Sequence, residues 1–493
     1  MGRSSSRHAP ERDRDGSSGG ARGLPRALAL TLASAFVWGV AHFVTGRRIA
    51  GSLLLALYVA IAAAVAAAAT VYRSDLLHLA VQPDVLQRLS AGLVALGAVW
   101  VLVVIRSYQI LRPLRMPISA RALGAAAVAV MCFAVGVPVA WSAHSTYVYR
   151  DALTSIFRTG SENGRQVDTE DPFNGQARVN ILLLGGDSAA DRTGVRTDSM
   201  TLASVDTETG DTVLLSLPRN LEHFPMPPGP ARDRFPYGFT GDGPLNPGLL
   251  NEVYEYAEQH PDVVPGVPKN HRGPELLKAT IAGILGLRVD YYILVDMFGF
   301  ADIVDAMGGV KIKVTEPIPY GLQGAVLQPG YRTLDGKEAL WYGRSRTNSS
   351  DYVRMGRQKC LMRAIAEQAD PQTVLTSFDK LAAAAKRTLA TDIPQELLPA
   401  LVKLSNKVKD GAEIRSLQFV PPLIYSGNPD FTLIRKLASD AVNSDPHAVS
   451  APPSGGQSGS PSASASTPDS PSPDGSQPPK PDSKPVSLEA ACP

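Results

Sequence analysis

Apolar residues are concentrated in the first 141 positions of the chain, in four segments at residues 27–44, 49–71, 91–105 and 122–141. The second segment contains no charged residue and is long enough to cross about 30 Å of hydrocarbon as a helix. The third reaches that length when the apolar positions from 89 to 110 are included. The pattern therefore predicts an α-helical membrane module over residues 27–141, with spans at 49–71, 89–110 and 122–141.

Arginines flank these segments unevenly. Six lie within residues 1–26, two at positions 47 and 48, and four between positions 106 and 121. Because positive loops remain in the cytoplasm, this distribution places all three groups inside the cell. The segment 27–44 is short and contains Gly39, so we expect a re-entrant hairpin there, and three spans then carry the rest of the chain outside. The alternative is four full spans with the large domain in the cytoplasm.

The remaining chain divides by composition into a leader, a connector, a globular domain and a tail. Residues 1–26 are polar and rich in Gly, Ser and Arg, and residues 444–493 are rich in Pro, Ser and Gly. Segments with so few apolar residues cannot offset the entropy of ordering, so both are expected to be disordered, the leader in the cytoplasm. A connector is expected at 142–176, and residues 177–443 are long enough for one core.

Within residues 177–443 the hydrophobic pattern alternates between strands and helices. It predicts strands at 179–184, 199–205, 212–217, 291–295 and 310–314, with the second and third forming a hairpin. It predicts helices at 249–257, 274–285, 298–307 and 354–368. Asp335 and Glu338 have the spacing of a capping box that begins another short helix. The alternation is typical of the α/β class with a central mixed sheet.

Net charge and cysteine content add little to this prediction of the fold class. The formal net charge of +2 gives no support for nucleic-acid binding driven by bulk charge. Of the three cysteines, Cys132 falls in a predicted span, and Cys360 and Cys492 would face an oxidising exterior. Those two could form a disulfide, or one could be a buried thiol and the other a free thiol in the tail.

Two carboxylates stand at predicted strand ends. Asp187 follows the first strand and a Gly-Gly pair, and Asp198 begins the next strand. Carboxylates at adjacent strand ends can share a hard cation such as Mg²⁺, which prefers one or two carboxylates together with phosphate oxygens. The alternative for each aspartate is an ordinary turn or cap residue.

Arginines accompany these carboxylates at positions 196, 219, 344, 346, 354 and 357. Arg354 and Gln358 are four residues apart in a predicted helix and therefore lie on one face. The planar guanidinium binds phosphate oxygens through two hydrogen bonds, so the set favours a diphosphate substrate. Alternatively, each arginine could be a solvated surface residue in a weak ion pair.

Several short motifs in this order are similar to those of the LytR-CpsA-Psr family of Gram-positive and actinobacterial cell envelopes. The resemblance covers residues 179 to 442 and rests on VNILLLGGD at 179–187, RTDSM at 196–200, SLPR at 216–219, LNEVY at 250–254, DYY at 290–292, DAMGGV at 305–310, LDGKEAL at 334–340, RSR at 344–346 and DYVRMGRQ at 351–358.

The resemblance implies a membrane-anchored, extracytoplasmic three-layer α/β/α domain with an apolar tunnel for a polyprenyl chain. It implies Mg²⁺-assisted transfer of a cell-wall glycopolymer from a polyprenyl diphosphate to a muramic-acid hydroxyl of peptidoglycan. By position, it implies metal binding by Asp187 and Asp198 and catalytic roles for Arg196, Asp198 and Arg219. It implies diphosphate binding by Arg196, Arg219, Arg344, Arg346, Arg354, Arg357 and Gln358. The partners implied are lipid-linked polymer, peptidoglycan and membrane, and no nucleic acid.

Two features depart from the family pattern or stay open. Asn220 stands where the family usually has aspartate, so any role of that carboxylate is lost or reduced to hydrogen bonding. Residues 224–247 are rich in Pro and Gly and are expected to form an expanded loop beside the site, either tuning substrate choice or inert. Six apolar residues are expected in the core first and in contact with lipid second: Ile281, Ile284, Leu285, Ile293, Phe300 and Ile303.

Three other functions fit parts of the sequence. A hydrolase would use the same site with water as the acceptor. A binding scaffold would hold the lipid-linked polymer without turnover. A membrane-bound transcriptional attenuator would need a cytoplasmic DNA-binding element, and the basic leader has no helix-turn-helix pattern.

Overall fold

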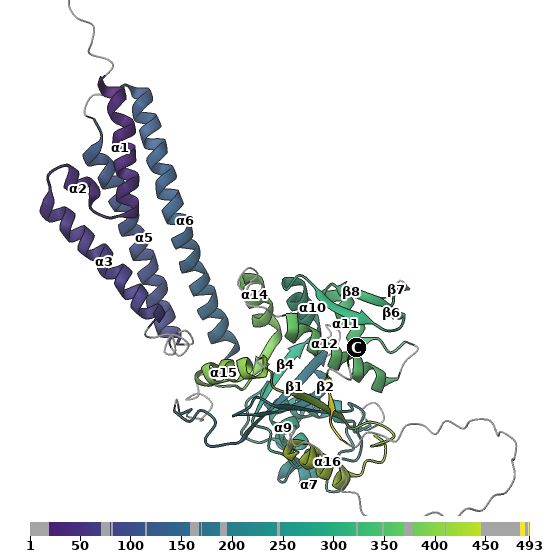
Figure 1. Ribbon diagram of the computed structural model, residues 1–493. Helices are drawn as coiled ribbons and strands as arrows, with labels where there is room; N and C mark the ends of the chain where they lie inside the picture. Colours follow the sequence, from purple (N-terminus) through teal and green to yellow (C-terminus); the bar gives the residue numbers. More distant parts are fainter. Residues whose placement is uncertain are drawn as a thin grey trace, which may run out of the picture. The chain divides into compact units, whose positions relative to one another are not determined.

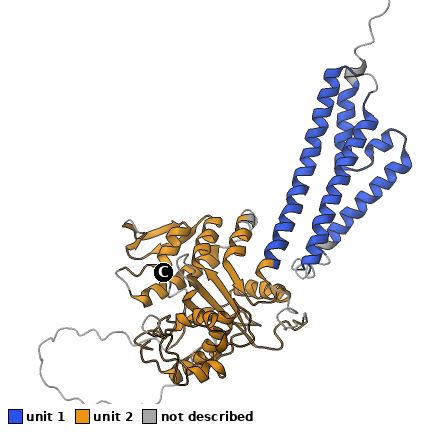
Figure 2. Cartoon of the chain, turned by 180° about the vertical axis from the view of Figure 1, so that it is seen from behind, with its two compact units in different colours: residues 1–154 blue, residues 155–493 orange. Residues whose placement is uncertain are grey.

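The computed structural model describes residues 19–70, 79, 82–113, 116–157, 167–168, 170–187, 195–243, 247–321, 324–347, 350–368, 378–409, 411–444, 484–488 and 492. The chain divides into two compact units, residues 1–154 and 155–493 (Figure 2).

The first unit is helical (Figure 1). Its elements are α1 (Gly19–Phe36), α2 (Val40–Val44), α3 (Arg48–Thr70), α5 (Pro83–Leu111) and α6 (Ile118–Ile156), the last of which continues to the boundary of the second unit. Among the described residues, α3, α5 and α6 are long and apolar enough to cross a membrane. The predicted spans fall in these three helices. Helix α6 also continues through residues 142–156, where a connector was expected.

The first apolar segment is divided between two helices. Gly39 separates α1 from α2 with φ of 98°, and a Cβ at this position would lie 2.4 Å from the carbonyl oxygen of Gly51. Residues 27–44 therefore form no single spanning helix, and the re-entrant hairpin stays a prediction.

The end of the leader is ordered, contrary to expectation. Helix α1 begins at Gly19, inside the segment 1–26 that we expected to be disordered, and residues 1–18 lie outside the described part. The cause is tertiary packing, because Leu24 is buried in one cluster with Val104, Tyr108 and Val128.

The second unit is built on a mixed seven-stranded sheet. Its strands are β1 (Arg178–Asp187), β2 (Arg196–Asp206), β3 (Thr212–Leu217), β4 (Tyr291–Asp296), β9 (Leu389–Thr391), β10 (Ile414–Gln418) and β11 (Val486–Ser487). Their order is β11-β10-β3-β2-β1-β4-β9. The pairs β1–β4 and β3–β10 are parallel and the other neighbours are antiparallel. The predicted hairpin of β2 and β3 is confirmed.

Helices cover both faces of this sheet, as predicted for a three-layer α/β/α domain. On one face Leu182, Leu184 and their neighbours pack in the main core against α8 (Val253–Gln259), α9 (Arg272–Leu285) and α16 (Phe431–Asn443). On the other face lie α10 (Met297–Ala306), α11 (Gly336–Arg344) and α12 (Asp351–Gln368). Asp335 caps α11 in a capping box with Glu338, as predicted.

The other elements lie outside the central sheet. Strands β5 (Val310–Val314) and β8 (Gly330–Leu334) form one ribbon, and β6 (Ile318–Tyr320) and β7 (Ala325–Leu327) form another. Within the described residues of this unit the other helices are α7 (Pro230–Arg234), α14 (Phe378–Thr388) and α15 (Leu398–Lys409), with short 3₁₀ turns at Leu250–Glu252, Pro261–Val263 and Gln395–Leu397.

Residues 224–247 are mostly irregular apart from α7, as their Pro and Gly content suggested, but the segment packs into the core instead of projecting from it. Phe224, Phe235 and Phe239 are buried, and the rings of Phe235 and Phe239 have centroids 5.0 Å apart. Phe239 also packs edge-on against Tyr256 of α8. The three phenylalanines bury enough apolar surface to hold this segment against the core. Residues 244–246 lie outside the described part.

The end of the tail is also ordered, contrary to expectation. Strand β11 pairs with the edge strand β10, and Leu488 is buried. Cys360 of α12 and Cys492 form a disulfide, which decides the alternative that the sequence left open. Arg363 donates hydrogen bonds to the carbonyl oxygens of Leu488 and Cys492. Residues 445–483 lie outside the described part.

Removing this disulfide is expected to destabilise the second unit. It joins residues 132 positions apart, and closing so long a loop restricts the unfolded chain, which contributes about 2–4 kcal/mol. Cys360→Ser/Cys492→Ser should therefore lower the thermal unfolding midpoint of the full-length protein in detergent. Dithiothreitol should produce a similar decrease in the wild type and none in the variant. Equal midpoints for the oxidised wild type and the variant would contradict this prediction.

Candidate active site

A β-bulge, where the end of β1 pairs with the start of β2, positions Asp198. Gly185 pairs with Ser199 and Gly186 with Thr197, so Asp198 is the extra residue on β2. A bulge turns adjacent side chains toward the same side of the strand. Consistent with this, Asp198 and Ser199 both line one cavity on the helical face formed by α10, α11 and α12.

Asp198 begins a chain of alternating charges. Nη1 of Arg219 donates to Oδ1 of Asp198, and Nε of Arg219 lies 3.4 Å from Oδ1 of Asp351. Nη2 of Arg354 lies 3.0 Å from the same Asp351 oxygen and donates to the main-chain carbonyl oxygen of Asp198 at 3.2 Å. Residues from β2, the end of β3 and α12 are thereby held in one cluster.

Arg354 is the most enclosed member of this cluster, with 2 % of its surface exposed. Burial lowers the pKa of its guanidinium, Asp351 opposes that shift, and the positive charge of Arg219 adds to it. An arginine stays protonated under such conditions, so the site keeps a shielded positive charge. A shielded charge attracts an anionic ligand more strongly than one surrounded by water.

Asp187 stands beside this cluster at the end of β1 and is 4 % exposed. Its Oδ2 accepts from Nη2 of Arg344 at 3.3 Å, whereas its Oδ1 has no hydrogen-bond partner among the described residues. In the strand register Asp187 pairs with Arg196, whose Nε lies 3.3 Å from Oε2 of Glu255. A buried carboxylate oxygen without a donor is suited to a cation.

The chemistry of these residues is compatible with Mg²⁺, and the metal site stays a prediction. The part of the chain that the structure describes contains no group of three or more His, Cys, Asp or Glu side chains arranged as a metal site. Mg²⁺ does not require such a group, because one or two carboxylates with substrate phosphates and water complete its coordination. Asp187 and Asp198 lie within two register positions of each other on neighbouring strands and could supply those carboxylates.

The cavity beside this cluster is apolar and has a volume of about 330 Å³. Ile293, Phe300 and Ile303 line it, together with the polar groups of Asp198, Arg344, Arg354 and Gln358. Ile281, Ile284 and Leu285 instead belong to the main core and are fully buried. The six apolar residues that the sequence could not distinguish are thus divided by the sheet into core residues and cavity residues.

Of the predicted diphosphate-binding residues, Arg357 lies apart from the cluster, and Arg346 lies near it but is exposed. Arg357 donates to the carbonyl oxygen of Ser345 and lines a different cavity, between α12 and the β5–β8 ribbon. Arg346 forms no ion pair within the described residues, and its positive charge adds to the lowering of the pKa of Arg354. Gln358, one residue after Arg357, faces the apolar cavity and donates to the carbonyl oxygen of Gly343. Successive helical residues point about 100° apart, which explains the separation.

Sequence reasoning did not assign Asp351 and Glu255 to the site. Asp351 joins Arg219 to Arg354, and its spacing of three residues before Arg354 is the available signal. Glu255 holds Arg196 and has no comparable signal, because α8 is distant in the sequence. Asn220 points elsewhere and donates through Nδ2 to Oγ of Ser426 at 3.1 Å, in agreement with a role limited to hydrogen bonding.

Known proteins with related sequences share this domain. The chain is 28% identical over 254 residues to the polyisoprenyl-teichoic acid–peptidoglycan teichoic acid transferase TagU of Oceanobacillus iheyensis, covering 51% of this chain and 70% of that protein. It is 29% identical over 236 residues to the probable cell wall biosynthesis protein LcpB of Corynebacterium glutamicum, covering 48% of this chain and 46% of that protein. The chain thus spans less than half the length of LcpB.

The chain also resembles solved structures and matches a family model. The crystal structure of B. subtilis TagV is 22% identical, with a TM-score of 0.38, and the match covers 55% of this chain and 98% of that chain. The model of the LytR_cpsA_psr family matches residues 146–433, which is more than half of the chain. The motifs, the α/β/α domain and this match agree, and the chain belongs to the LytR_cpsA_psr family.

Proposed function

We propose that this protein transfers an anionic cell-wall glycopolymer from a polyprenyl diphosphate carrier to a muramic-acid hydroxyl of peptidoglycan. One observation carries the proposal: the apolar cavity is lined at its polar side by Asp198, Arg344 and Arg354. Such a site suits a molecule with an apolar chain joined to a strongly anionic group. The name of the relative TagU, a polyisoprenyl-teichoic acid–peptidoglycan teichoic acid transferase, supports the same chemistry.

Each part of the carrier has a matching part of the site. Ile293, Phe300 and Ile303 would contact the hydrocarbon, whose burial is favourable because it removes apolar surface from water. Arg344 and Arg354 would bind diphosphate oxygens through charge-assisted hydrogen bonds. Gln358 would add a neutral donor.

The transfer itself needs positioning and charge stabilisation more than covalent help. The acceptor oxygen attacks the phosphorus that bears the glycan, the bond to the bridging oxygen breaks, and polyprenyl phosphate leaves. The hydroxyl proton is released and a phosphodiester remains. Arg219 and Arg354 would stabilise the charge that develops on the phosphoryl oxygens and the leaving phosphate.

Asp187 and Asp198 would hold Mg²⁺ in this proposal. When bound, the ion would neutralise phosphate charge as a Lewis acid. The unpartnered Oδ1 of Asp187 supports this assignment. Arg344 would keep Asp187 oriented through its hydrogen bond to Oδ2.

The proposal places the second unit outside the cytoplasmic membrane, anchored by several spans. The three long apolar helices and the arginine distribution support this arrangement. A reporter enzyme that is active only outside the cytoplasm, fused after residue 170, should be active. Activity only of a cytoplasmic reporter at the same position would contradict the topology.

The function can be tested with the full-length protein in detergent, Mg²⁺, a synthetic polyprenyl-diphosphate glycan and uncrosslinked peptidoglycan. We expect labelled glycan to become covalently attached to peptidoglycan, and Asp198→Ala to abolish this. Free phosphorylated glycan with unmodified peptidoglycan would instead indicate the hydrolase. Tight lipid binding without turnover would indicate the scaffold.

A larger side chain in the apolar cavity should weaken the binding of carriers with a long polyprenyl chain more than that of short ones. Ile303→Trp adds volume to a cavity of about 330 Å³ and should raise KM for a long polyprenyl carrier at least about tenfold. A short carrier of one or two isoprene units should be affected much less. Ile281→Val, a core change on the opposite face of the sheet, is the control. An equal rise in KM for both carriers would show that the lipid does not enter this cavity.

A further inference from the structure

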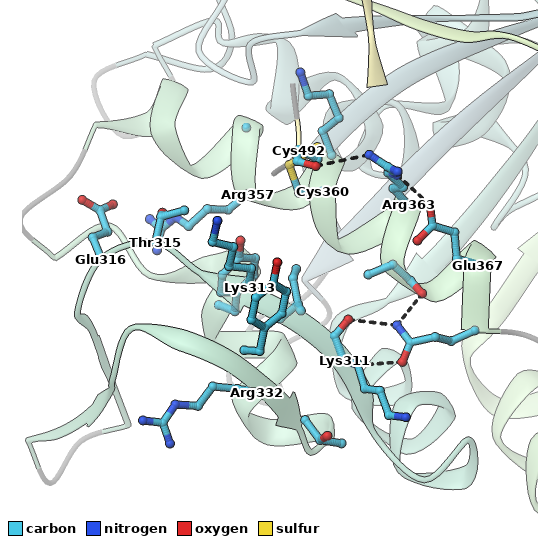
Figure 3. Close-up of a pocket in the computed structure, with 18 of the residues that line it drawn as sticks. Lys311, Lys313, Thr315, Glu316, Arg332, Arg357, Cys360, Arg363, Glu367 and Cys492 are labelled. Carbon is cyan, nitrogen blue, oxygen red and sulfur yellow. Dashed lines mark hydrogen bonds and ion pairs between the residues drawn. A yellow bond between two sulfur atoms is a disulfide. The ribbon is translucent and has the colours of Figure 1, made fainter. Parts of the chain in front are cut away.

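A second cavity, of about 810 Å³, lies on the other side of α12 (Figure 3). One wall is the β5–β8 ribbon, which contributes Lys311, Lys313 and Arg332. The opposite wall is α12, and the Cys360–Cys492 disulfide lies beside it. The proposed transfer reaction does not use this cavity.

The lining of this cavity is strongly basic. It contains six basic side chains and two acidic ones, Glu316 and Glu367. Glu367 pairs with Arg363 at 2.7 Å, and Glu316 interacts electrostatically with Arg357. Both acids are therefore engaged with arginines that are already held by main-chain carbonyl oxygens. The excess of positive charge comes from the other basic residues.

Four of these basic residues have no acidic partner within the described part of the chain: Lys311, Lys313, Arg332 and Lys359. Lys313 lies over the ring of Tyr331, with Nζ 5.8 Å from its centroid, which holds the ammonium in place without neutralising it. A fixed group of unneutralised cations around a hollow concentrates anions there.

Lys359 is the most shielded of the four. Burial lowers the pKa of its ammonium from the ordinary value, and no acidic group opposes that shift. Placing a cation in such a position costs free energy unless an anion accompanies it. Lys359 also follows Gln358 directly and borders the small pocket that contains Asp198 and Arg219. Helix α12 thus places cations on both of its sides.

We propose that this cavity binds the phosphate groups of a phosphodiester-linked glycan chain, as a second polymer site separated from the reaction site by α12. The proposal rests on the proposed function for the source of the polymer. Several lysines spaced over the walls of a wide cavity suit successive phosphates better than a single small anion, because each ammonium acts as an independent point charge. Binding here would hold the polymer while its terminal phosphate reacts.

The test uses the full-length protein in detergent and a fluorescent, lipid-free glycerol-phosphate oligomer, with binding followed by polarisation. Lys313→Gln/Lys359→Gln should weaken binding about tenfold or more, since two charged hydrogen bonds are lost. Lys311→Glu, a change at an exposed side chain that should not disturb folding, should also weaken it. Lys403→Gln/Lys436→Gln removes the same charge at exposed positions of α15 and α16 and should bind like the wild type.

One further variant and a set of competitors distinguish a polymer site from the reaction site, from a single-ion site and from a lipid-headgroup site. Arg219→Ala should retain oligomer binding although it loses transfer, so failure of this proposal differs from failure of the proposed function. A neutral oligosaccharide of equal length should not compete. Equal binding by the wild type, Lys313→Gln/Lys359→Gln and Lys311→Glu would overturn the proposal. Displacement as effective by inorganic phosphate, or by monomeric short-chain phosphatidylglycerol, as by unlabelled oligomer would also overturn it, in favour of a single-ion or lipid-headgroup site.

Discussion

Replacing Arg219 with alanine is expected to lower kcat for glycopolymer transfer by about 10²–10³-fold. Arg219 lies between Asp198 and Asp351 and is the residue that joins the two carboxylates in the cluster. In the proposed mechanism its loss removes a donor that would stabilise the transferred phosphate, and it also removes the ion-pair partner of Asp198. The measurement is the rate of label transfer at saturating carrier, with the unfolding midpoint recorded in parallel.

Two variants control for this effect. Arg219→Lys keeps the charge but loses the planar pair of donors, so it should recover only part of the activity. Arg387→Ala removes an exposed arginine that pairs with Asp302 and should leave the rate unchanged. An Arg219→Ala protein with wild-type kcat would remove this residue from the proposed mechanism.

Replacing Arg354 with alanine is expected to lower both stability and activity. Arg354 is almost fully buried and balances the charge of Asp351, and it also binds the main chain of Asp198. Without Arg354 the mostly buried Asp351 keeps only its contact with Arg219 at 3.4 Å, so the loss should approach about 3–5 kcal/mol, the cost of a broken buried ion pair. The thermal unfolding midpoint of the full-length protein should therefore decrease clearly, whereas Arg219→Ala should change it less.

A double-variant cycle separates the two roles of Arg354. Asp351→Ala/Arg354→Ala removes both charges and should be more stable than Arg354→Ala alone, while transfer stays impaired. Arg346→Ala, at an exposed position that forms no ion pair within the described residues, should have the midpoint of the wild type. Additive losses of stability in the cycle would contradict the pairing of Asp351 with Arg354.

Strands and helices were predictable because their signals are local. The apolar run that became β1, the hairpin of β2 and β3, and the capping box at Asp335 each depend on residues close together in sequence. The leader and the tail were predicted less well. Their ordered parts, α1 from Gly19 and β11 with Cys492, are stabilised by contacts with residues distant in sequence. Amino-acid composition alone gives no information about such contacts.

In the segment 224–247, too, the sequence predicted the local backbone but not the tertiary contacts. Its Pro and Gly content indicated a loop, and the backbone there is indeed mostly irregular. Its three phenylalanines nevertheless lie in the core, because Tyr256 and the neighbouring residues form a surface that receives them. The burial of these phenylalanines therefore depends on the position of α8 in the folded domain.

By itself the sequence determined the α/β class, the apolar helices, the family and the set of charged residues from which a site could be built. These depend on periodicity, composition and spacing, which are properties of the chain alone. The tertiary structure decided which of those residues meet. The bulge at Asp198 and the packing of α12 on the sheet bring Asp198, Arg219 and Arg354 together. Arg357 lies on another side of α12 and therefore lines the second cavity. These outcomes require long-range packing, because α12 lies far along the sequence from the hairpin of β2 and β3.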